Sequence, residues 1–452
     1  MSEGADRIAA LSAAQKRALL EEMLREKAAP SAGAAPNAGA ALAAGAEARA
    51  AGRGGFVFPA EYAGFARAFE DSDDGGAADL FFQLCEGVNA SRAMVSGREL
   101  VNFCSYNYLG LSGHDEVSRA ASAAIERYGT SVSASRLVSG ERPIHRQLEG
   151  RLAALVGAED AVVFVGGFST NENAIGHLLG PEDLIVYDSL IHASIQQGAK
   201  LSGATVLPFP HNNLAALENI LARRRGAYRQ ALIAVEGVYS MDGDIPDLPR
   251  LVEIKRRHNA LVLVDEAHSI GVLGGTGRGI GEYHGVAGSD VDLWMGTLSK
   301  ALASCGGYIA GTREVVAYLK RTAPGFVYSV GLSPPDTAAA LAALGVLEAE
   351  PQRVACLKAR ARLFLDLAKA RGLDTGASRD SAVIPIMTGA TDRAVRLSKA
   401  LLGQGFLALP IGYPAVPENK ARLRFFISST HSEDDIRRTI NAIGNCLEQI
   451  DQ

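Results

Sequence analysis

The chain has 452 residues, of which 48% are hydrophobic and 21% charged, with a net charge of −5 and a pI near 6.0. This is enough apolar material for a large core and two domains, and no block of like charge or long apolar run favours nucleic acid or a membrane as partner. The polar N-terminus shows no signal peptide, and five scattered cysteines without C-x-x-C spacing favour a reducing cytoplasm.

Residues 1–55 predict a helix followed by a linker, largely disordered. Residues 11–28 carry leucines at helical spacing, and Ser12 with Gln15 matches a capping box. Residues 29–53 are mostly Ala, Gly and Pro, which cannot form a core. One hypothesis for the function is therefore a non-catalytic assembly module led by residues 1–53.

The folded part is expected to begin near Phe56, with an N-terminal segment over 56–112. Antiparallel strands are expected after residue 80, followed by a helix that ends near Tyr128. From there on, apolar strand candidates alternate with helical stretches, which predicts parallel βαβ units in a large domain over 113–335. The candidates lack polar alternation, as strands covered on both faces do; they lie at 161–165, 184–188, 205–209, 231–238, 261–265, 293–296 and 306–311.

The texture of the sequence changes after Pro334 and Pro335. A long Ala- and Leu-rich helix is expected from about Asp336, and a last helix from about Glu433. Strand candidates lie between them at 382–387 and 422–428. This pattern predicts a smaller α+β C-terminal domain over 336–452.

Polar side chains follow two of the predicted strands of the large domain. Asp265 and His268 come just past one strand, and Lys300 comes just past another, among small residues. Ligands bind at the carboxyl ends of strands in an open parallel sheet. Asp265 and Lys300 are therefore expected to face one pocket.

Two other interpretations of this region are weak. The letters DEAH at 265–268 also occur in helicases, but those need a G-K-[ST] phosphate loop, which this chain lacks. The glycines from Gly274 to Gly281 do not give the dinucleotide pattern G-x-G-x-x-G. They indicate instead a close-packed loop whose backbone passes near a ligand.

Three further strand ends add chemistry to the same edge. Residues 166–171 (GGFSTN) open a helix and would bind an anion with backbone N–H groups, unless they form an ordinary turn. His192 and the polar loop 236–244 follow two other strands, where structural roles are the plain alternative. No spacing suits a metal site. A lysine, an aspartate, two histidines and a phosphate cradle together suit pyridoxal 5′-phosphate (PLP), which binds lysine as a Schiff base.

The sequence resembles the α-oxoamine synthase family from about Phe103 to the C-terminus. This family includes 8-amino-7-oxononanoate synthase, 2-amino-3-ketobutyrate CoA ligase, 5-aminolevulinate synthase and serine palmitoyltransferase. The resemblance implies the PLP-dependent fold type I, which is aspartate aminotransferase-like, and a homodimer with shared active sites. The motifs that carry it are SYNYLG, DSLIHAS, EGVYSMDGD, VDEAHSIGVLG, GTLSKALASCGGYIAG, YSVGLSPP and RFFISSTHSEDDI.

The resemblance also implies roles for individual residues. Lys300 would form the Schiff base, Asp265 would pair with the pyridinium nitrogen, and His192 would stack on the ring. Arg424 would bind the substrate carboxylate and Asn107 would lie near the amino-acid pocket. The ring oxygen would meet His268 and Ser240, and the phosphate would meet Gly167, Phe168, Thr297, Ser299 and, from the partner subunit, Ser329.

The reaction implied is a decarboxylative condensation of serine, glycine or alanine with an acyl thioester, giving an α-aminoketone. An aminotransferase or lyase of the same fold is the alternative. The SYNYLG turn is similar to the corresponding turn of serine palmitoyltransferase. Residues 129–145 resemble the corresponding segment of synthases that are associated with polyketide pathways. With the linker, these departures favour a natural-product or sphingoid-like pathway and an acyl carrier protein as donor, with a CoA thioester as the other option.

Overall fold

The computed structural model describes residues 80–452. The helix expected over 11–28, the linker and the start of the fold near Phe56 therefore lie outside the described residues. No helix among residues 80–452 combines the length and the apolar character that a membrane crossing requires.

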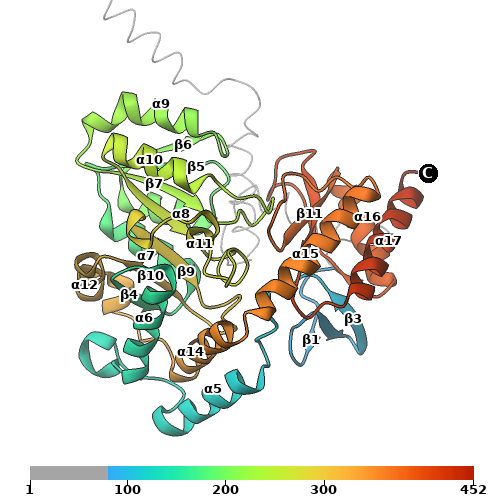
Figure 1. The fold of residues 1–452 in the computed structure, drawn as a ribbon, viewed down its shortest axis with the longest axis horizontal. Helices are drawn as coiled ribbons and strands as arrows, with labels where there is room; N and C mark the ends of the chain where they lie inside the picture. Colours follow the sequence, from blue (N-terminus) through green and yellow to red (C-terminus); the bar gives the residue numbers. More distant parts are fainter. Residues whose placement is uncertain (1–79) are drawn as a thin grey trace, which may run out of the picture. The chain divides into compact units, whose positions relative to one another are not determined.

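A central sheet of seven strands organises the larger part of the structure (Figure 1). The neighbours β5–β6, β5–β7, β7–β8 and β8–β9 are parallel, which confirms the mostly parallel sheet. In spatial order the strands are β4 (Asp160–Phe164), β10 (Gly307–Gly311), β9 (Leu293–Thr297), β8 (Leu261–Asp265), β7 (Ala231–Glu236), β5 (Leu184–Asp188) and β6 (Thr205–Phe209).

One strand corrects the expectation of parallel units throughout. The strand expected at 306–311, β10, runs antiparallel to both of its neighbours, β9 and β4. The connection 298–306 is too short for the crossover that a parallel pair needs, which takes a dozen or more residues. Lys300 lies in this short connection, three residues after the end of β9.

Helices cover both faces of the sheet, which explains why its strands are apolar without alternation. One face packs on α7 (Gly167–Leu178), α8 (Ala193–Ser202), α12 (Arg313–Thr322) and α13 (Pro324–Val327). The other packs on α6 (Pro143–Val156), α9 (Leu214–Arg224), α10 (Leu248–His258) and α14 (Pro334–Ala349), with α5 (Asp115–Tyr128) against α14. The helix expected from Asp336 begins two residues earlier because the Ser333 side chain caps it. A short α11 (Ile280–His284) follows β8.

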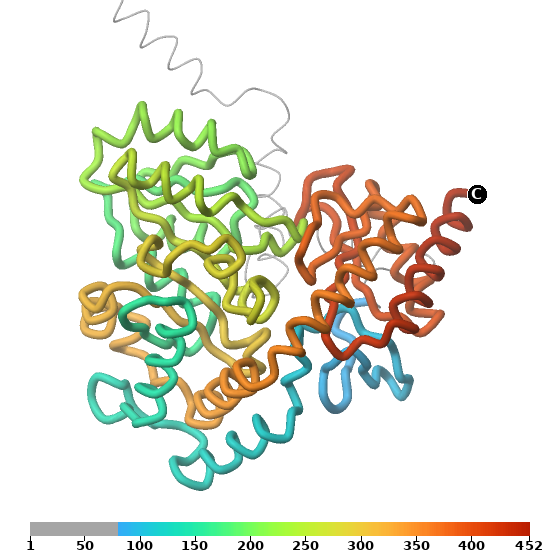
Figure 2. Tube along the Cα trace, viewed as in Figure 1, coloured from blue at the N-terminus to red at the C-terminus, as the bar shows by residue number. Residues whose placement is uncertain are grey.

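The C-terminal part forms an α+β layer of its own. Its sheet has the order β11 (Val383–Gly389), β14 (Ala421–Phe426) and β13 (Pro410–Ile411), all antiparallel. The helices are α15 (Gln352–Ala370), α16 (Thr391–Gly403) and α17 (Glu433–Ile450). Figure 2 shows the first described strands beside this part. They form a second small sheet in which β12 (Phe406–Leu407) pairs in parallel with β3 (Arg98–Asn102), β3 pairs with β2 (Arg92–Val95), and β2 pairs with β1 (Cys85–Glu86).

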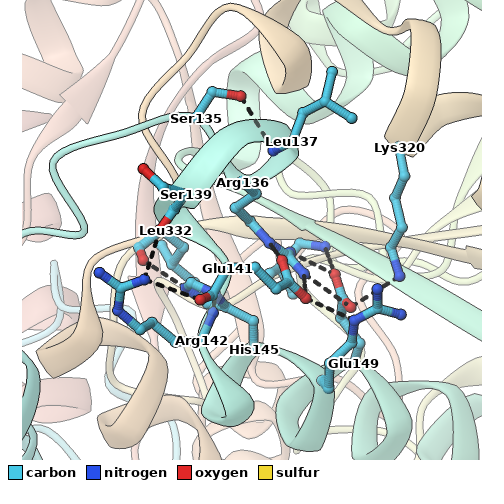
Figure 3. A network of polar contacts seen from close by, with 12 residues as sticks. Ser135, Arg136, Leu137, Ser139, Glu141, Arg142, His145, Glu149, Lys320 and Leu332 are labelled. Atoms are coloured by element: carbon cyan, nitrogen blue, oxygen red, sulfur yellow. Dashed lines mark hydrogen bonds and ion pairs between the residues drawn. The ribbon is translucent and has the colours of Figure 1, made fainter.

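A buried network of charges fixes the segment 136–149 (Figure 3). Arg136 donates to Glu141 at 2.6 Å and to Glu149 at 2.6 Å, and Lys320 donates to Glu149 at 2.9 Å. The backbone N–H of Val163 also donates to Glu149. The network therefore joins α6, β4 and α12.

Candidate active site

A cavity lies at the carboxyl ends of β7, β8 and β9. It brings Asp265 and Lys300 together, as the positions of their strands predicted. Its wall consists of Gly167, Phe168, His192, Ser194, Glu236, Asp265, Ala267, His268, Met295, Thr297 and Lys300. The roles that the resemblance implies for these residues stay predictions, and the geometry below shows what each can do.

A chain of hydrogen bonds runs from Asp265 to His192. The amide nitrogen of Asn171, on α7, donates to Asp265 Oδ2 and to Ser194 Oγ, both at 2.9 Å. The Ser194 hydroxyl lies 2.8 Å from His192 Nδ1, and the backbone N–H of Ala267 donates to Asp265 Oδ1. Both oxygens of the Asp265 carboxyl group are thus held by neutral N–H donors. Burial lowers the pKa of His192 and nearby Lys300 adds to the effect, against the attraction of Asp265.

His268 lies among aromatic rings at the opposite wall. The hydroxyl of the fully buried Tyr108 lies 2.7 Å from His268 Nδ1. The Phe426 ring is nearly parallel to the imidazole at 6.0 Å, and the Tyr106 ring meets it edge-on at 5.9 Å. Burial lowers the pKa of His268 well below its usual value, and the positive charges of Lys300 and Arg424 add to this. His268 is therefore a neutral hydrogen-bonding group.

Lys300 has no hydrogen-bond or ion-pair partner among residues 80–452. Its Nζ lies 5.7 Å from the centre of the Tyr106 ring. Burial lowers the pKa of the Lys300 ammonium, while Asp265 and Glu236 act in the opposite direction. A lysine that loses its proton more easily is a better nucleophile for a carbonyl group and a better base.

The N-terminus of α7 lies at the place where an anion cradle is predicted. Gly167 is its first residue, and a Cβ there would lie 2.7 Å from Thr297 Oγ1. The Thr297 and Ser299 hydroxyls both point to the Gly306 carbonyl, at 3.1 and 3.5 Å. Backbone N–H groups, hydroxyls and the helix dipole converge here, as a phosphate requires. With the amine and the buried carboxylate, this donor set fits PLP.

Glu236 lines the cavity, although the sequence analysis assigned it no role. It is buried at the end of β7, in register with Asp265 on β8. It accepts hydrogen bonds from the backbone N–H groups of Ser240 and His192. Burial raises the pKa of Glu236 well above its usual value, and the charge of Asp265 adds to this. Its position at a strand end, like that of Asp265, was the signal for it.

A second cavity of about 650 Å³ adjoins the first and shares His192 and Glu236 with it. Ser240, expected at the ring oxygen, lines this second cavity. Arg424, on β14, donates to the Ser240 carbonyl at 2.8 Å, and its buried Nε has no partner among residues 80–452. Such an unsatisfied guanidinium donor favours a carboxylate ligand.

Four predicted site residues line neither cavity: Ser299, Arg424, Asn107 and Ser329. Asn107 is buried, and its side chain bonds the backbone of Ser112 in both directions, so it closes the turn after β3. Its neighbour Tyr106 is the residue that faces Lys300. Ser329 lies on a partly exposed segment, where its hydroxyl donates to the adjacent Val330 carbonyl.

The glycine loop 274–281 is close-packed, but not around a ligand cavity that holds Lys300. A Cβ on Gly279 would lie within 2.7 Å of the Glu266 carboxylate, and one on Gly274 would meet Glu282. Both glycines have positive φ angles of about 90°. The expectation that this backbone approaches a ligand is therefore corrected: it wraps buried Glu266.

Comparison with known proteins agrees with this geometry. The family described as Aminotransferase class I and II matches residues 98–443. The chain is 44% identical to 8-amino-7-oxononanoate synthase of Geobacter sulfurreducens over 367 residues, which is 80% of this chain and 93% of that protein. It is 38% identical to the enzyme of the same name from Thermosipho melanesiensis over 376 residues, or 83% and 95% of the two chains.

Solved structures give the same result. A lysine-to-alanine variant of serine palmitoyltransferase from S. paucimobilis, solved with a bound PLP–myriocin aldimine, matches with a TM-score of 0.82 and 28% identity, covering 86% of this chain and 98% of that one. The 8-amino-7-oxononanoate synthase of Francisella tularensis matches with a TM-score of 0.68 and 28% identity, covering 78% and 99%.

Proposed function

This protein belongs to the α-oxoamine synthases within the class I and II aminotransferase family, and on that premise we propose that it condenses a small amino acid with an acyl thioester to an α-aminoketone. The family is PLP-dependent and has fold type I. The observation that carries the proposal is the single cavity that holds a half-buried, unpaired Lys300 opposite Asp265, beside a cradle for phosphate.

Each residue of the site has a proposed role toward the cofactor. Bound PLP supplies the electron sink that stabilises a carbanion at the amino-acid Cα. Lys300 would anchor it, Asp265 would keep its ring nitrogen protonated, and His192 would cover one ring face. His268 and Ser240 meet the ring oxygen, while Gly167, Phe168, Thr297 and Ser299 hold the phosphate, joined by Ser329 of the partner subunit.

The same residues account for the reaction steps. Arg424 holds the amino-acid carboxylate, and the Lys300 amine, whose pKa is lowered by burial, removes the Cα proton. Cα then bonds to the thioester carbonyl carbon, and the thiol leaves with the electron pair of the broken C–S bond. The carboxylate departs as CO2, and Cα takes up one proton to give the product.

The aromatic wall supports a small amino acid such as serine, glycine or alanine. Tyr106 packs edge-on against Phe426 at 4.7 Å, and the Arg424 guanidinium lies 4.5 Å from the centre of the Phe426 ring. Tyr106 also lies 5.7 Å from Lys300 Nζ. A substrate that reaches from Lys300 to Arg424 must pass these rings, which leave little space for a large side chain.

The adjoining cavity supports an acyl chain as the second substrate. Leu190, Ile191, Met241, Met387 and Val416 give it apolar walls beside the shared residues His192 and Glu236. A natural-product or sphingoid-like pathway fits this, with the chain delivered by a carrier protein or by CoA. The free thiols of all five cysteines agree with a cytoplasmic site.

An exposed apolar patch supports a homodimer. It consists of Leu137, Val138, Tyr328 and Val330, which are 55, 81, 86 and 47% exposed. The two segments meet because the Gly331 N–H donates to the Ala134 carbonyl. Ser329 lies within this patch, as a residue that serves the partner's site must. Apolar patches of this kind mark protein–protein contacts.

A matrix of amino acids against acyl thioesters tests the proposal. Serine, glycine and alanine are each combined with acyl-CoA and with acyl carrier protein, and CO2, free thiol and product mass are measured. Release of thiol and CO2 only when both substrates are present is expected. Formation of a 2-oxo acid without thioester would instead identify an aminotransferase. A protein that binds no PLP would overturn both, and truncation of residues 1–53 tests the assembly hypothesis.

A further inference from the structure

His268 has a buried hydroxyl behind it. Tyr108 is 0% exposed, and its hydroxyl lies 2.7 Å from His268 Nδ1. No other hydrogen-bond partner for this hydroxyl occurs among residues 80–452. The Tyr108 backbone is also fixed, because its N–H donates to the Tyr106 carbonyl and its carbonyl accepts from the Ser429 N–H. The geometry of the pair is therefore set by the turn 105–110.

The direction of this hydrogen bond follows from the surroundings. Burial raises the pKa of Tyr108 well above its usual value, so the hydroxyl keeps its proton and must donate it. Within the described part of the chain, the only acceptor in hydrogen-bond contact with it is Nδ1 of His268. Since burial and nearby positive charges lower the pKa of His268, the imidazole is neutral and carries one proton. That proton must be on Nε2.

The second imidazole of the site shows the same arrangement by an independent route. The backbone N–H of Ser194 donates to His192 Nδ1 at 3.3 Å. A backbone N–H can only donate, so His192 Nδ1 is also unprotonated. Asn171 directs the Ser194 hydroxyl toward the same nitrogen, because its own amide hydrogen occupies the oxygen from the other side. Both histidines therefore have only Nε2–H as a donor.

We propose that Tyr108 is a positioning residue that fixes His268 as its Nε2–H tautomer, so that the imidazole offers an N–H donor to the cofactor cavity. This rests on the proposed function, which places the cofactor's ring oxygen next to His268. The Phe426 and Tyr106 rings hold the plane of the imidazole, and Tyr108 sets which nitrogen carries the proton. Without the hydroxyl, the proton divides between the two nitrogens and the donor is partly lost.

Tyr108→Phe in the PLP-loaded protein tests this, because phenylalanine keeps the buried ring and removes only the hydroxyl. Tyr308→Phe is the matched control: Tyr308 is also 0% exposed, and its hydroxyl has no partner among the described residues. The first readout is NMR of protein with ¹⁵N-labelled histidine, with the His268 signals assigned by their loss in His268→Gln. The second is the affinity for PLP and the visible absorbance of the bound cofactor.

The wild type should show unprotonated Nδ1 and protonated Nε2 across about pH 6 to 8, where an ordinary histidine titrates. Tyr108→Phe should mix the tautomers and weaken PLP binding by roughly 2- to 10-fold, the loss that one hydrogen bond produces. Tyr308→Phe should do neither. Protonated Nδ1 in the wild type, or an unchanged tautomer in Tyr108→Phe, would overturn the proposal.

Two further outcomes separate this proposal from the proposed function. Mixed tautomers with unchanged PLP affinity and absorbance would overturn the role of His268 as a donor to the cofactor. Loaded protein that consumes no acyl thioester would overturn the proposed function, while the NMR result would still decide the role of Tyr108.

Discussion

Replacing Gly167 by alanine should damage the phosphate cradle. The new methyl group would lie 2.7 Å from Thr297 Oγ1 and 3.2 Å from Thr297 Cβ, closer than side chains normally approach. The Thr297 side chain must move, and its hydroxyl then leaves the cradle. Gly150 provides the matched control because it lies in α6, is exposed, and has nothing within 4 Å of an added Cβ.

The two alanine substitutions should change the free energy of unfolding in opposite directions. Overpacking at position 167 costs about 1 to 3 kcal/mol of unfolding free energy, whereas alanine at Gly150 in an exposed helix gains about 0.5 to 1 kcal/mol. Loss of one hydrogen bond to a charged phosphate, about 1.5 to 3 kcal/mol, weakens PLP binding by roughly 10- to 150-fold in Gly167→Ala. Gly150→Ala should bind PLP like the wild type.

Titration of the cofactor-free protein with PLP, followed by visible absorbance, measures the affinity. Denaturant unfolding of the same cofactor-free variants measures the stability. If Gly167→Ala matched Gly150→Ala in both measurements, the close approach between α7 and Thr297 would have no role in holding phosphate, and the cradle would have to be elsewhere.

Four further predictions follow from the structure. Lys300→Ala should lose the visible absorbance of bound PLP and about 10²- to 10⁴-fold in turnover; retention of either would remove its assigned role. Arg424→Ala should weaken apparent amino-acid affinity by several-fold to a few hundred-fold with little change in PLP binding, and unchanged affinity would contradict the carboxylate contact. Burial lowers the pKa of His431 to about 4, below the ordinary 6.5, so its contribution to stability is complete above pH 6.5 and is lost as pH falls toward 4; His431→Gln should therefore remove about 2 kcal/mol of the stability difference between about pH 7 and 5, measured by denaturant unfolding. Glu149→Ala leaves Arg136 and Lys320 without their shared carboxylate and should cost about 3 to 5 kcal/mol, far more than Glu141→Ala, whose side chain is 35% exposed.

The positions of the strands in the central sheet could be predicted from the sequence, but the direction of one strand, β10, could not. Runs such as 261–265 are apolar throughout because both faces of the sheet are covered, so their length and spacing predicted them. The antiparallel course of β10 depends on a short return at 298–306, which composition does not reveal. The described helices α5 and α17 end and begin, respectively, at the expected residues, Tyr128 and Glu433, whereas the cap formed by Ser333 moves the start of α14 two residues ahead of the expected one.

Part of the site could also be predicted from the sequence, and part of it could not. Asp265, His268 and Lys300 could be placed together because each follows a strand, and strand ends meet at one edge. Tyr108 lies 160 positions from His268 and carries no periodic signal, so only the folded structure joins them. Asn107 illustrates the limit of a motif: the sequence identified the correct turn, but the structure uses Asn107 to close it and turns Tyr106 toward Lys300.

The register of the sheet decides the charge of the cavity. Glu236 and Asp265 end neighbouring strands directly opposite each other, so two buried carboxyl groups compete for one negative charge. Asp265 receives the Asn171 side-chain amide as well as the Ala267 N–H, whereas Glu236 has only backbone donors; both side chains are buried. Burial and the neighbouring Asp265 together therefore raise the pKa of Glu236 well above its usual value. A carboxyl group that holds its proton more tightly attracts the Lys300 ammonium less, which leaves the Lys300 amine easier to deprotonate.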